Sequence, residues 1–335
     1  MLNGGVCVPR QYAQFVGTAY GQNVNAFFDK LVDQGLAVKC PCVHNRARVY
    51  QLRHQALYRA VGEPNSPNRK PIAAGRLEER LRLLDTIVAQ PGLVWLSTVS
   101  EKVAFFTEAS SCPPERLPHK SIGTGANSLV RLFPDALPIG LQGNRRPVFI
   151  FVVSTSNHDE LRAFVQRHAD LLGLLPGWAI RLVLPPHFEG IKSLFEGIVR
   201  DELASPMSPR SLEELRWYFE QRRRVTPGDN AEGDRFRRVG RAFAGTRWRL
   251  LYRRWLADGD VVFDSATYSA IRDAIARGDG AIEGEVLPRS YRHLSPLASL
   301  VRARVRGVEE GDGAAGSPQP PSAERAASFA AMIRG

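Results

Sequence analysis

One aspartate in this sequence stands where a hydrolytic enzyme could place a metal ligand. Asp135 follows a proline, and the next apolar run of the chain, residues 147–153, comes after a polar turn. Metal-dependent hydrolysis requires a second carboxylate to hold the cation and a lysine near the attacking water. The apolar run supplies neither group. We therefore expect no catalytic residue, unless acidic partners such as Glu101 or Asp159 reach Asp135 and make a nuclease.

Two cysteines and a histidine form the only other candidate metal site. A single residue separates Cys40 from Cys42, and His44 follows, but zinc-binding pairs usually have wider spacing and a second pair of ligands. The four cysteines of the chain are few and unevenly spaced, which favours a reducing compartment over a disulfide framework. We expect no metal and no cofactor.

Residues 8–53 carry polar side chains at a spacing that suits nucleic-acid recognition. A proline at the first helical position and Gly17 predict a short helix at 9–16, and apolar residues at helical spacing predict a second helix that ends at Gly35. Residues 36–38 and 48–53 are strand-like runs on either side of a turn. Helix, turn, helix and ribbon follow one another in the order of a winged helix, although the residues before Pro9 are too few for the helix that usually precedes such a pair.

In a winged helix the second helix lies in the major groove, with its first polar residues at base edges. Glutamine and asparagine suit bidentate contacts to adenine, while lysine and arginine suit phosphates. The candidate DNA-binding residues of this segment are Arg10, Gln22, Asn23, Asn25, Lys30, Arg46 and Arg48. Winged helices also dock proteins, so the layout alone does not fix the partner.

Composition agrees with a DNA-binding protein. The chain has 335 residues, 44% of them hydrophobic, and a net charge of +11. This length allows two or three domains, and the positive charge favours a polyanionic partner. A solvated basic surface is the alternative. No apolar run approaches the length of a membrane span and no signal-peptide pattern precedes residue 8, so we expect a cytoplasmic protein associated with the nucleoid.

The central part of the chain predicts an α/β core. Strand-like runs at 133–141 and 147–153 precede an amphipathic helix at 159–175 and a further strand at 179–184. This order of strand, strand, helix and strand resembles a restriction-endonuclease-like core, here without its catalytic residues. Residues 112–125 hold three prolines and two glycines, and we expect them to form an irregular connection or a lid.

A basic helical region follows. A single helix is predicted at 234–258, in which aromatic residues alternate with arginines. The arginines could bind phosphates, or they could be the solvated face of a helix whose aromatic residues form a core. The candidate DNA-binding residues of this region are Arg222, Arg223, Arg224, Arg237 and Arg241.

The predicted fold class is therefore α/β, more narrowly α+β, with several segments. They are a winged helix at 1–62, a linker at 63–75, a degenerate nuclease-like domain at 76–204, a basic helical region at 205–306 and a disordered tail at 307–335.

The chain resembles replication-relaxation-like proteins of bacterial plasmids and integrated mobile elements. The features that carry the resemblance are the winged helix, the linker, Asp135 with its preceding Phe133 and Pro134, and the two strands that follow. The resemblance covers roughly residues 8–185 and implies a DNA-binding accessory role in replication, mobilisation or transcription control. The expected partner is double-stranded DNA, bound without enzymatic activity. A metal-dependent nuclease and a module that docks replication or conjugation proteins remain alternatives, and a homodimer on a palindromic site is a further hypothesis.

Overall fold

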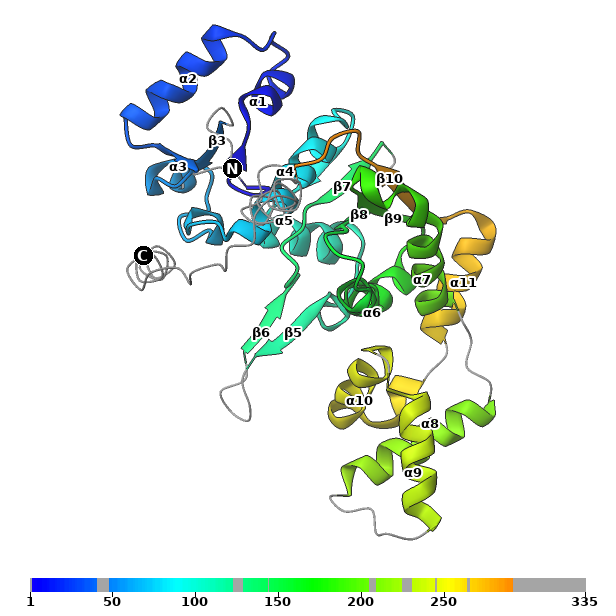
Figure 1. Ribbon diagram of the computed structural model, residues 1–335. Helices are drawn as coiled ribbons and strands as arrows, with labels where there is room; N and C mark the ends of the chain where they lie inside the picture. Colours follow the sequence, from blue (N-terminus) through cyan, green and yellow to red (C-terminus); the bar gives the residue numbers. More distant parts are fainter. Residues whose placement is uncertain are drawn as a thin grey trace, which may run out of the picture.

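The protein has a mixed fold of helices and sheets, of the α+β class (Figure 1). The computed structural model describes residues 2–40, 48–122, 129–143, 145–204, 209–224, 231–244, 246–263 and 266–291. Arg46, Cys42, His44 and the predicted tail at 307–335 lie outside these ranges. In the described part of the chain, strands form one sheet of three strands, one of five and one of two.

The first module contains the helices and strands that the sequence predicted, in the predicted order. Its elements are β1 (Val6–Cys7), α1 (Pro9–Phe15), α2 (Gln22–Asp33), β2 (Ala37–Cys40), β3 (Val49–Leu52) and α3 (Gln55–Ala60). The antiparallel sheet has the order β1-β3-β2, and its edge strand β1 was not predicted. Ala13, Val24, Phe28 and Tyr50 form a small buried core between the helices and the sheet, because the apolar positions of α2 recur at helical spacing.

Residues 63–75, predicted as a linker, are held against this module by hydrogen bonds. The amide of Gln51 on β3 donates to the backbone oxygens of Asn68 and Lys70 at 3.0 and 2.6 Å. The Asn68 side chain in turn donates to the Leu2 oxygen at 2.8 Å. A short 3-10 helix, Pro67–Arg69, lies within the segment. Proline and asparagine here specify an ordered turn.

Helix α4 (Ala74–Val88) belongs to two cores at once. It contacts α1 and β1, and its first half contributes Leu77 and Leu81 to a core shared with the three-stranded sheet. Its second half contributes Leu83 and Ile87 to a core beneath the central sheet. Helix α4 packs against α1 although it follows the β2–β3 ribbon in the chain. In a winged helix, the helix in this place usually precedes the helix-turn-helix pair in the sequence.

The central sheet combines antiparallel and parallel strands. Its members are β4 (Val94–Leu96), β7 (Ile139–Gln142), β8 (Arg146–Val152), β9 (Trp178–Leu184) and β10 (Gly280–Val286), in the order β10-β9-β8-β7-β4. Strand β7 is antiparallel to both neighbours, whereas β8, β9 and β10 are parallel. Helix α6 (Asp159–Leu174) connects β8 to β9. The predicted succession of strand, strand, helix and strand is thus present, although the first strand begins only at Ile139.

Both faces of this sheet are buried, which explains the continuous apolar run of β8. Phe149 packs toward α6 and α7 (Lys192–Ala204), while Val148 and Ile150 pack toward α4. Helix α11 (Ala266–Arg277) contacts α6, α7 and β10 on the first of these faces. A strand that is covered on both sides reads as an uninterrupted apolar run.

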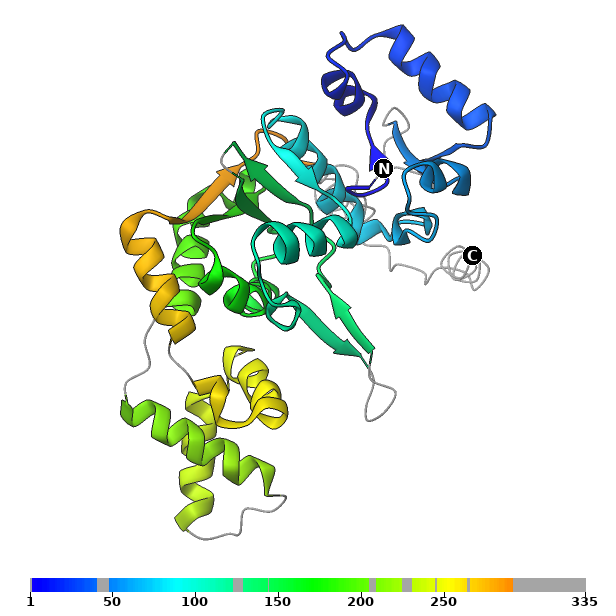
Figure 2. The same ribbon diagram turned by 180° about the vertical axis from the view of Figure 1, so that it is seen from behind.

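Between β4 and β7 the chain forms a helix and a two-stranded ribbon. Helix α5 (Val99–Ala104) continues as a π-helical turn at Phe105–Ala109, and β5 (His119–Ile122) then pairs with β6 (Leu129–Leu132) in antiparallel register. The ribbon projects from the central sheet in both views (Figures 1 and 2). The prediction of an irregular segment at 112–125 was therefore wrong for residues 119–122.

The region predicted as helical from 205 onward contains a strand of the central sheet. Helices α8 (Pro209–Arg223), α9 (Ala231–Ala242) and α10 (Thr246–Asp258) form a separate bundle with its own core, placed in sequence between α7 and α11 (Figure 2). After α11 the chain returns to the sheet as β10. The single helix predicted at 234–258 is two helices, because α9 ends at Ala242 and α10 begins at Thr246.

Candidate nucleic-acid interface

Helix α2 presents a polar surface to solvent. Val24 and Phe28 are buried against the module, whereas Gln22 and Asn23 in the first turn of α2 and Lys30 further along the helix are exposed. Within the described part of the chain, Gln22 and Asn23 make no side-chain hydrogen bond, so their amide groups are available to a ligand. Figure 1 shows α2 at the outer edge of the module.

Asn25 differs from the two residues before it. Its side-chain nitrogen donates to the backbone oxygen of Gly21 at 3.2 Å, one turn earlier. Its side-chain oxygen is buried and has no hydrogen-bond partner among the described residues. The Asn25 side chain therefore stabilises the first turn of α2. This arrangement does not fit the contact with a base that the sequence predicted for Asn25.

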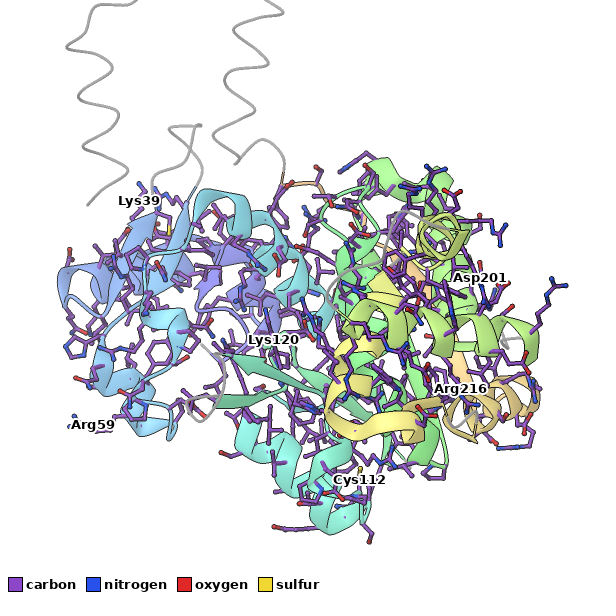
Figure 3. The ribbon with its side chains drawn as sticks, turned by 90° about the horizontal axis from the view of Figure 1, so that it is seen from below. Lys39, Arg59, Cys112, Lys120, Asp201 and Arg216 are labelled. Atoms are coloured by element: carbon purple, nitrogen blue, oxygen red, sulfur yellow. The ribbon has the colours of Figure 1, made fainter. Side chains whose placement is uncertain are left out.

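Three cations lie on the surface of the same module. Lys30 and Lys39 are exposed, and Lys39 lies at the edge of the module in the view from below (Figure 3). Arg48 is exposed and lies 4.0 Å from the Asp29 carboxylate, which also accepts a hydrogen bond from the Tyr50 hydroxyl at 3.4 Å. Burial, and after it the Asp29 charge, raise the pKa of Tyr50, so that hydroxyl stays protonated. Lys39 was not predicted from the sequence. It is exposed although it shares a face of β2 with the buried Ala37, so alternation along the strand does not reveal it.

Arg10, predicted to bind phosphate, is engaged inside the protein. Its guanidinium pairs with Asp85 on α4 at 3.1 Å and donates to the Tyr291 hydroxyl at 2.6 Å. Gln11 is fully buried beside it and donates to Asp85 at 2.8 Å and to the Leu81 oxygen at 2.7 Å. This network ties α1 to α4 and to the segment after β10. This network gives Arg10 a structural role that the sequence did not predict, because the sequence does not reveal that α4 packs against α1.

The arginines of the α8–α10 bundle lie over its aromatic core. Arg222 sits 4.4 Å above the Tyr252 ring, Arg223 lies 6.0 Å from the Trp255 ring and the unpredicted Arg235 lies 4.0 Å from Trp217. Of the two interpretations of this region, the aromatic core is present, and guanidinium groups lie over its rings. Cation–π contacts of this kind leave guanidinium edges in solvent.

The remaining predicted residues of the bundle are exposed. Arg237 pairs with Asp234 at 2.7 Å on the same helix, and Arg224 and Arg241 are exposed at the ends of α8 and α9. An exposed ion pair one helical turn apart contributes little to stability, so the Arg237 guanidinium can readily leave Asp234 for another anion.

Asp135 is engaged by an arginine. Both carboxylate oxygens accept from Arg167 on α6, one of them from Nε at 3.2 Å and the other from Nη2. Nearby, the buried ammonium of Lys102 donates to the Leu137 oxygen at 2.7 Å and lies 5.6 Å from the Phe133 ring. A cavity of about 10 Å³ lies behind this loop, room for about one water molecule.

Two buried bases beside Asp135 have shifted pKa values. Burial lowers the pKa of Lys102 to about 8, against the opposing charges of Glu101 and Asp135. Burial likewise lowers the pKa of His168 to about 4, although Asp135 and the backbone oxygen of Phe164 raise it. Both bases are packed inside the protein, where Lys102 donates to the Leu137 oxygen and the His168 ring bonds the Phe164 oxygen.

The two acidic residues considered as partners of Asp135 do not join it. The Glu101 carboxylate accepts from the backbone nitrogens of Ser97 and Thr98, both at 2.7 Å, and caps α5. Asp159 begins α6 and is exposed. No group of three histidine, cysteine, aspartate or glutamate side chains that could hold a metal ion occurs among the described residues.

The sequence did not identify two cations on the β5–β6 ribbon. Lys120 and Arg131 are directly opposite each other in the register of the two strands, and both are exposed. The runs at 119–122 and 129–132 are only four residues long and do not alternate between polar and apolar residues, so the sequence offers no clear strand signal there.

Comparisons of the chain with protein-family models, with curated proteins and with solved structures found no match. Within the described residues no helix combines the length and the apolar character needed to cross a bilayer.

Proposed function

We propose that the protein binds double-stranded DNA and performs no chemistry on it. The observation that carries the proposal is the exposed first turn of α2, where Gln22 and Asn23 have unoccupied amide groups above a packed module. Amides at the start of a helix can read adenine through two hydrogen bonds. Lys30, Lys39 and Arg48 supply positive charge on the same module for the flanking phosphates.

The biological role that we propose follows from the resemblance to replication-relaxation-like proteins. A DNA-binding accessory protein of a bacterial mobile element would act in replication, mobilisation or transcription control. Such a role needs recognition of a site and does not need cleavage. The net charge of +11 supports binding at physiological salt, since phosphate neutralisation supplies most of the sequence-independent affinity.

The proposal is tested by selecting bound sequences from a library of random duplexes with the full-length protein. We expect enrichment of a defined motif, and we expect Gln22→Ala/Asn23→Ala to lose that enrichment while still binding DNA at low salt. Gln142→Ala, at the exposed end of β7, is the matched control and keeps the motif. Each lost bidentate contact costs about 1–3 kcal/mol of discrimination. Unchanged enrichment in the α2 variant would contradict base reading by these residues.

The contacts of Asp135 support a non-enzymatic protein. A carboxylate that already accepts two hydrogen bonds from a guanidinium has little capacity left for a divalent cation. Strand β8 offers only Phe149, Ile150, Phe151 and Val152 at the positions where a nuclease would need a carboxylate and a lysine. Supercoiled plasmid incubated with the protein and Mg²⁺ or Mn²⁺ should remain intact. Nicking that Asp135→Asn abolishes would replace this proposal by a metal-dependent nuclease.

A second candidate function is the docking of another protein, and one observation favours it. Phe15 at the end of α1 is 70% exposed, and Tyr20 in the following turn is 58% exposed. Large apolar side chains that gather on a surface often mark a protein contact. Phe15→Ser/Tyr20→Ser should leave the selected DNA motif unchanged if α2 reads DNA alone. Loss of the motif, together with a change from dimer to monomer in sedimentation, would favour a homodimer that places two copies of α2 on one site.

A further inference from the structure

The β5–β6 ribbon is a separate structural feature with its own anchor. At its base Leu117 and Phe133 are buried in the main core. The backbone nitrogen of Phe133 donates to the Pro118 oxygen at 2.7 Å, and the His119 ring bonds the Leu117 oxygen at 2.9 Å. Beyond this anchor the ribbon is two strands wide, and no third strand among the described residues pairs with it. A ribbon of two strands is only marginally stable in water, so it needs the anchor.

One face of the ribbon combines positive charge with apolar side chains. The register pairs Lys120 with Arg131 and Ile122 with Leu129, and side chains two residues apart in a strand share a face. Ile122 is 49% and Leu129 is 73% exposed. No carboxylate in the described part of the chain pairs with Lys120 or Arg131. The face therefore has two cations and two apolar side chains in one plane.

Such a face is unfavourable in the isolated protein. Like charges directly opposite each other destabilise a pair of strands, and exposed Ile and Leu side chains gain nothing from solvent. Both costs are removed by a ligand that is anionic and offers apolar edges. A nucleic-acid groove does this, because phosphates line its rims and base and sugar edges line its floor, and a major groove admits a two-stranded ribbon.

We propose that the β5–β6 ribbon is a second DNA contact, which enters a groove of the duplex. Lys120 and Arg131 then lie at the phosphates of the rims, and Ile122 and Leu129 lie against the base and sugar edges of the floor. The proposal rests on the proposed function for the class of its ligand, but it uses no residue of α2. Figure 3, from below, shows Lys120 on the ribbon, which is a separate element from α2. The complementary charges favour DNA over a second copy of this basic chain as the occupant.

The test measures how the affinity of the full-length protein for a labelled duplex changes with salt. The logarithm of the binding constant falls with the logarithm of salt by about 0.9 for each phosphate neutralised. Lys120→Gln/Arg131→Gln should therefore reduce this slope by about 1.8, so that the loss of affinity between about 50 and 200 mM salt becomes about tenfold smaller. The exchange Lys120→Arg/Arg131→Lys keeps both charges and should keep the wild-type slope.

The control removes two cations elsewhere. Arg200 on α7 and Arg272 on α11 are exposed, and these helices lie away from the ribbon in both views (Figures 1 and 2). Arg200→Gln/Arg272→Gln should leave the slope within about 0.5 of the wild type. An equal reduction in the control and ribbon variants would overturn the inference, because it would show a general effect of net charge.

The outcomes separate the two proposals. A wild-type protein that binds no duplex at low salt overturns the proposed function and the ribbon's ligand with it. A wild-type protein that selects a motif through Gln22 and Asn23, with a slope unchanged in the ribbon variant, overturns the ribbon contact alone. Thermal unfolding of each variant by circular dichroism checks folding, and the charge-preserving exchange shows whether charge or shape of the ribbon matters. Sedimentation that finds a dimer lost with Lys120→Gln/Arg131→Gln would assign the ribbon to a second copy instead.

Discussion

Asp135 and the first turn of α2 differ in what their side chains already contact. Asp135 is held by two hydrogen bonds from Arg167 beside the buried Lys102 and His168, and the space behind its loop has room for only about one water molecule. Gln22 and Asn23 are exposed and make no side-chain hydrogen bond within the described part of the chain. Both sites contain polar residues that a sequence pattern selects for function.

Burial and hydrogen bonding distinguish a polar residue that serves the fold from one that is available for binding. Replacing a group that is buried and paired leaves its partner unsatisfied, which costs stability. Replacing a group whose hydrogen bonds go to water costs nothing in the free protein, and its loss is felt only in the complex. Substitutions at the Asp135 site should therefore lower the stability of the free protein. Substitutions in the first turn of α2 should weaken DNA recognition and leave stability almost unchanged.

The largest effect should come from His168 and depends on pH. Its pKa is about 4 in the folded protein, against 6.5 ordinarily, because burial disfavours the charged ring. Between these values the unfolded chain binds more protons, so stability is complete above 6.5 and falls as the pH drops toward 4. The expected loss is about 3 kcal/mol.

Urea unfolding of the wild type and of His168→Gln at a series of pH values measures this loss. Glutamine keeps a donor for the Phe164 oxygen but does not titrate, so the wild type should lose about 3 kcal/mol more than the variant between neutral and acid pH. Asp135, Arg167 and Lys102 act on the same ring and are unchanged in both proteins, so the difference between the two stability curves reports His168. Parallel stability curves would show that His168 is not buried as a neutral ring.

A smaller loss is expected from Arg167→Ala. The substitution leaves the Asp135 carboxylate without its two hydrogen bonds, and both side chains are about one-fifth exposed, with 19% for Arg167 and 23% for Asp135. Because solvent screens such a pair, we expect a loss of about 1–3 kcal/mol, below the range for fully buried ion pairs. Denaturant unfolding measures it, with Arg200→Ala as an exposed control. A coupling energy near zero in the double-mutant cycle with Asp135→Ala would show that the pair does not hold the loop.

Local periodicity predicted most of the elements that position these sites. Helix α2, the β2–β3 ribbon, strands β8 and β9 and helix α6 each carry a pattern of apolar residues that reports burial within one segment. The exposed side of α2 follows from the same pattern, so Gln22 and Asn23 were placed correctly on the surface.

Contacts between distant segments could not be predicted in this way. Strand β10 joins the sheet next to β9 although about a hundred residues separate them in the chain, and its sequence contains two glycines and two glutamates. Arg181 on β9 pairs with Glu283 on β10 at 3.0 Å. The charged residues of β10 are therefore explained only when β9 is known to be its neighbour. The role of Arg10 was missed for the same reason, because Asp85 and Tyr291 come from far along the sequence.

The smallest expected change concerns the stability of the Gln22→Ala/Asn23→Ala variant. Both side chains are exposed, and neither has a hydrogen-bond partner among the described residues. Alanine has a higher helix propensity than asparagine by a few tenths of a kcal/mol, so the free energy of unfolding should stay within about 0.5 kcal/mol of the wild type or rise slightly. Denaturant unfolding beside the duplex selection measures stability and recognition on the same preparation. Loss of the motif without loss of stability separates this turn from the Asp135 site. A loss of stability above about 1 kcal/mol would instead show that these amides hold the module together, and α2 would then join Asp135 among the residues that serve the fold.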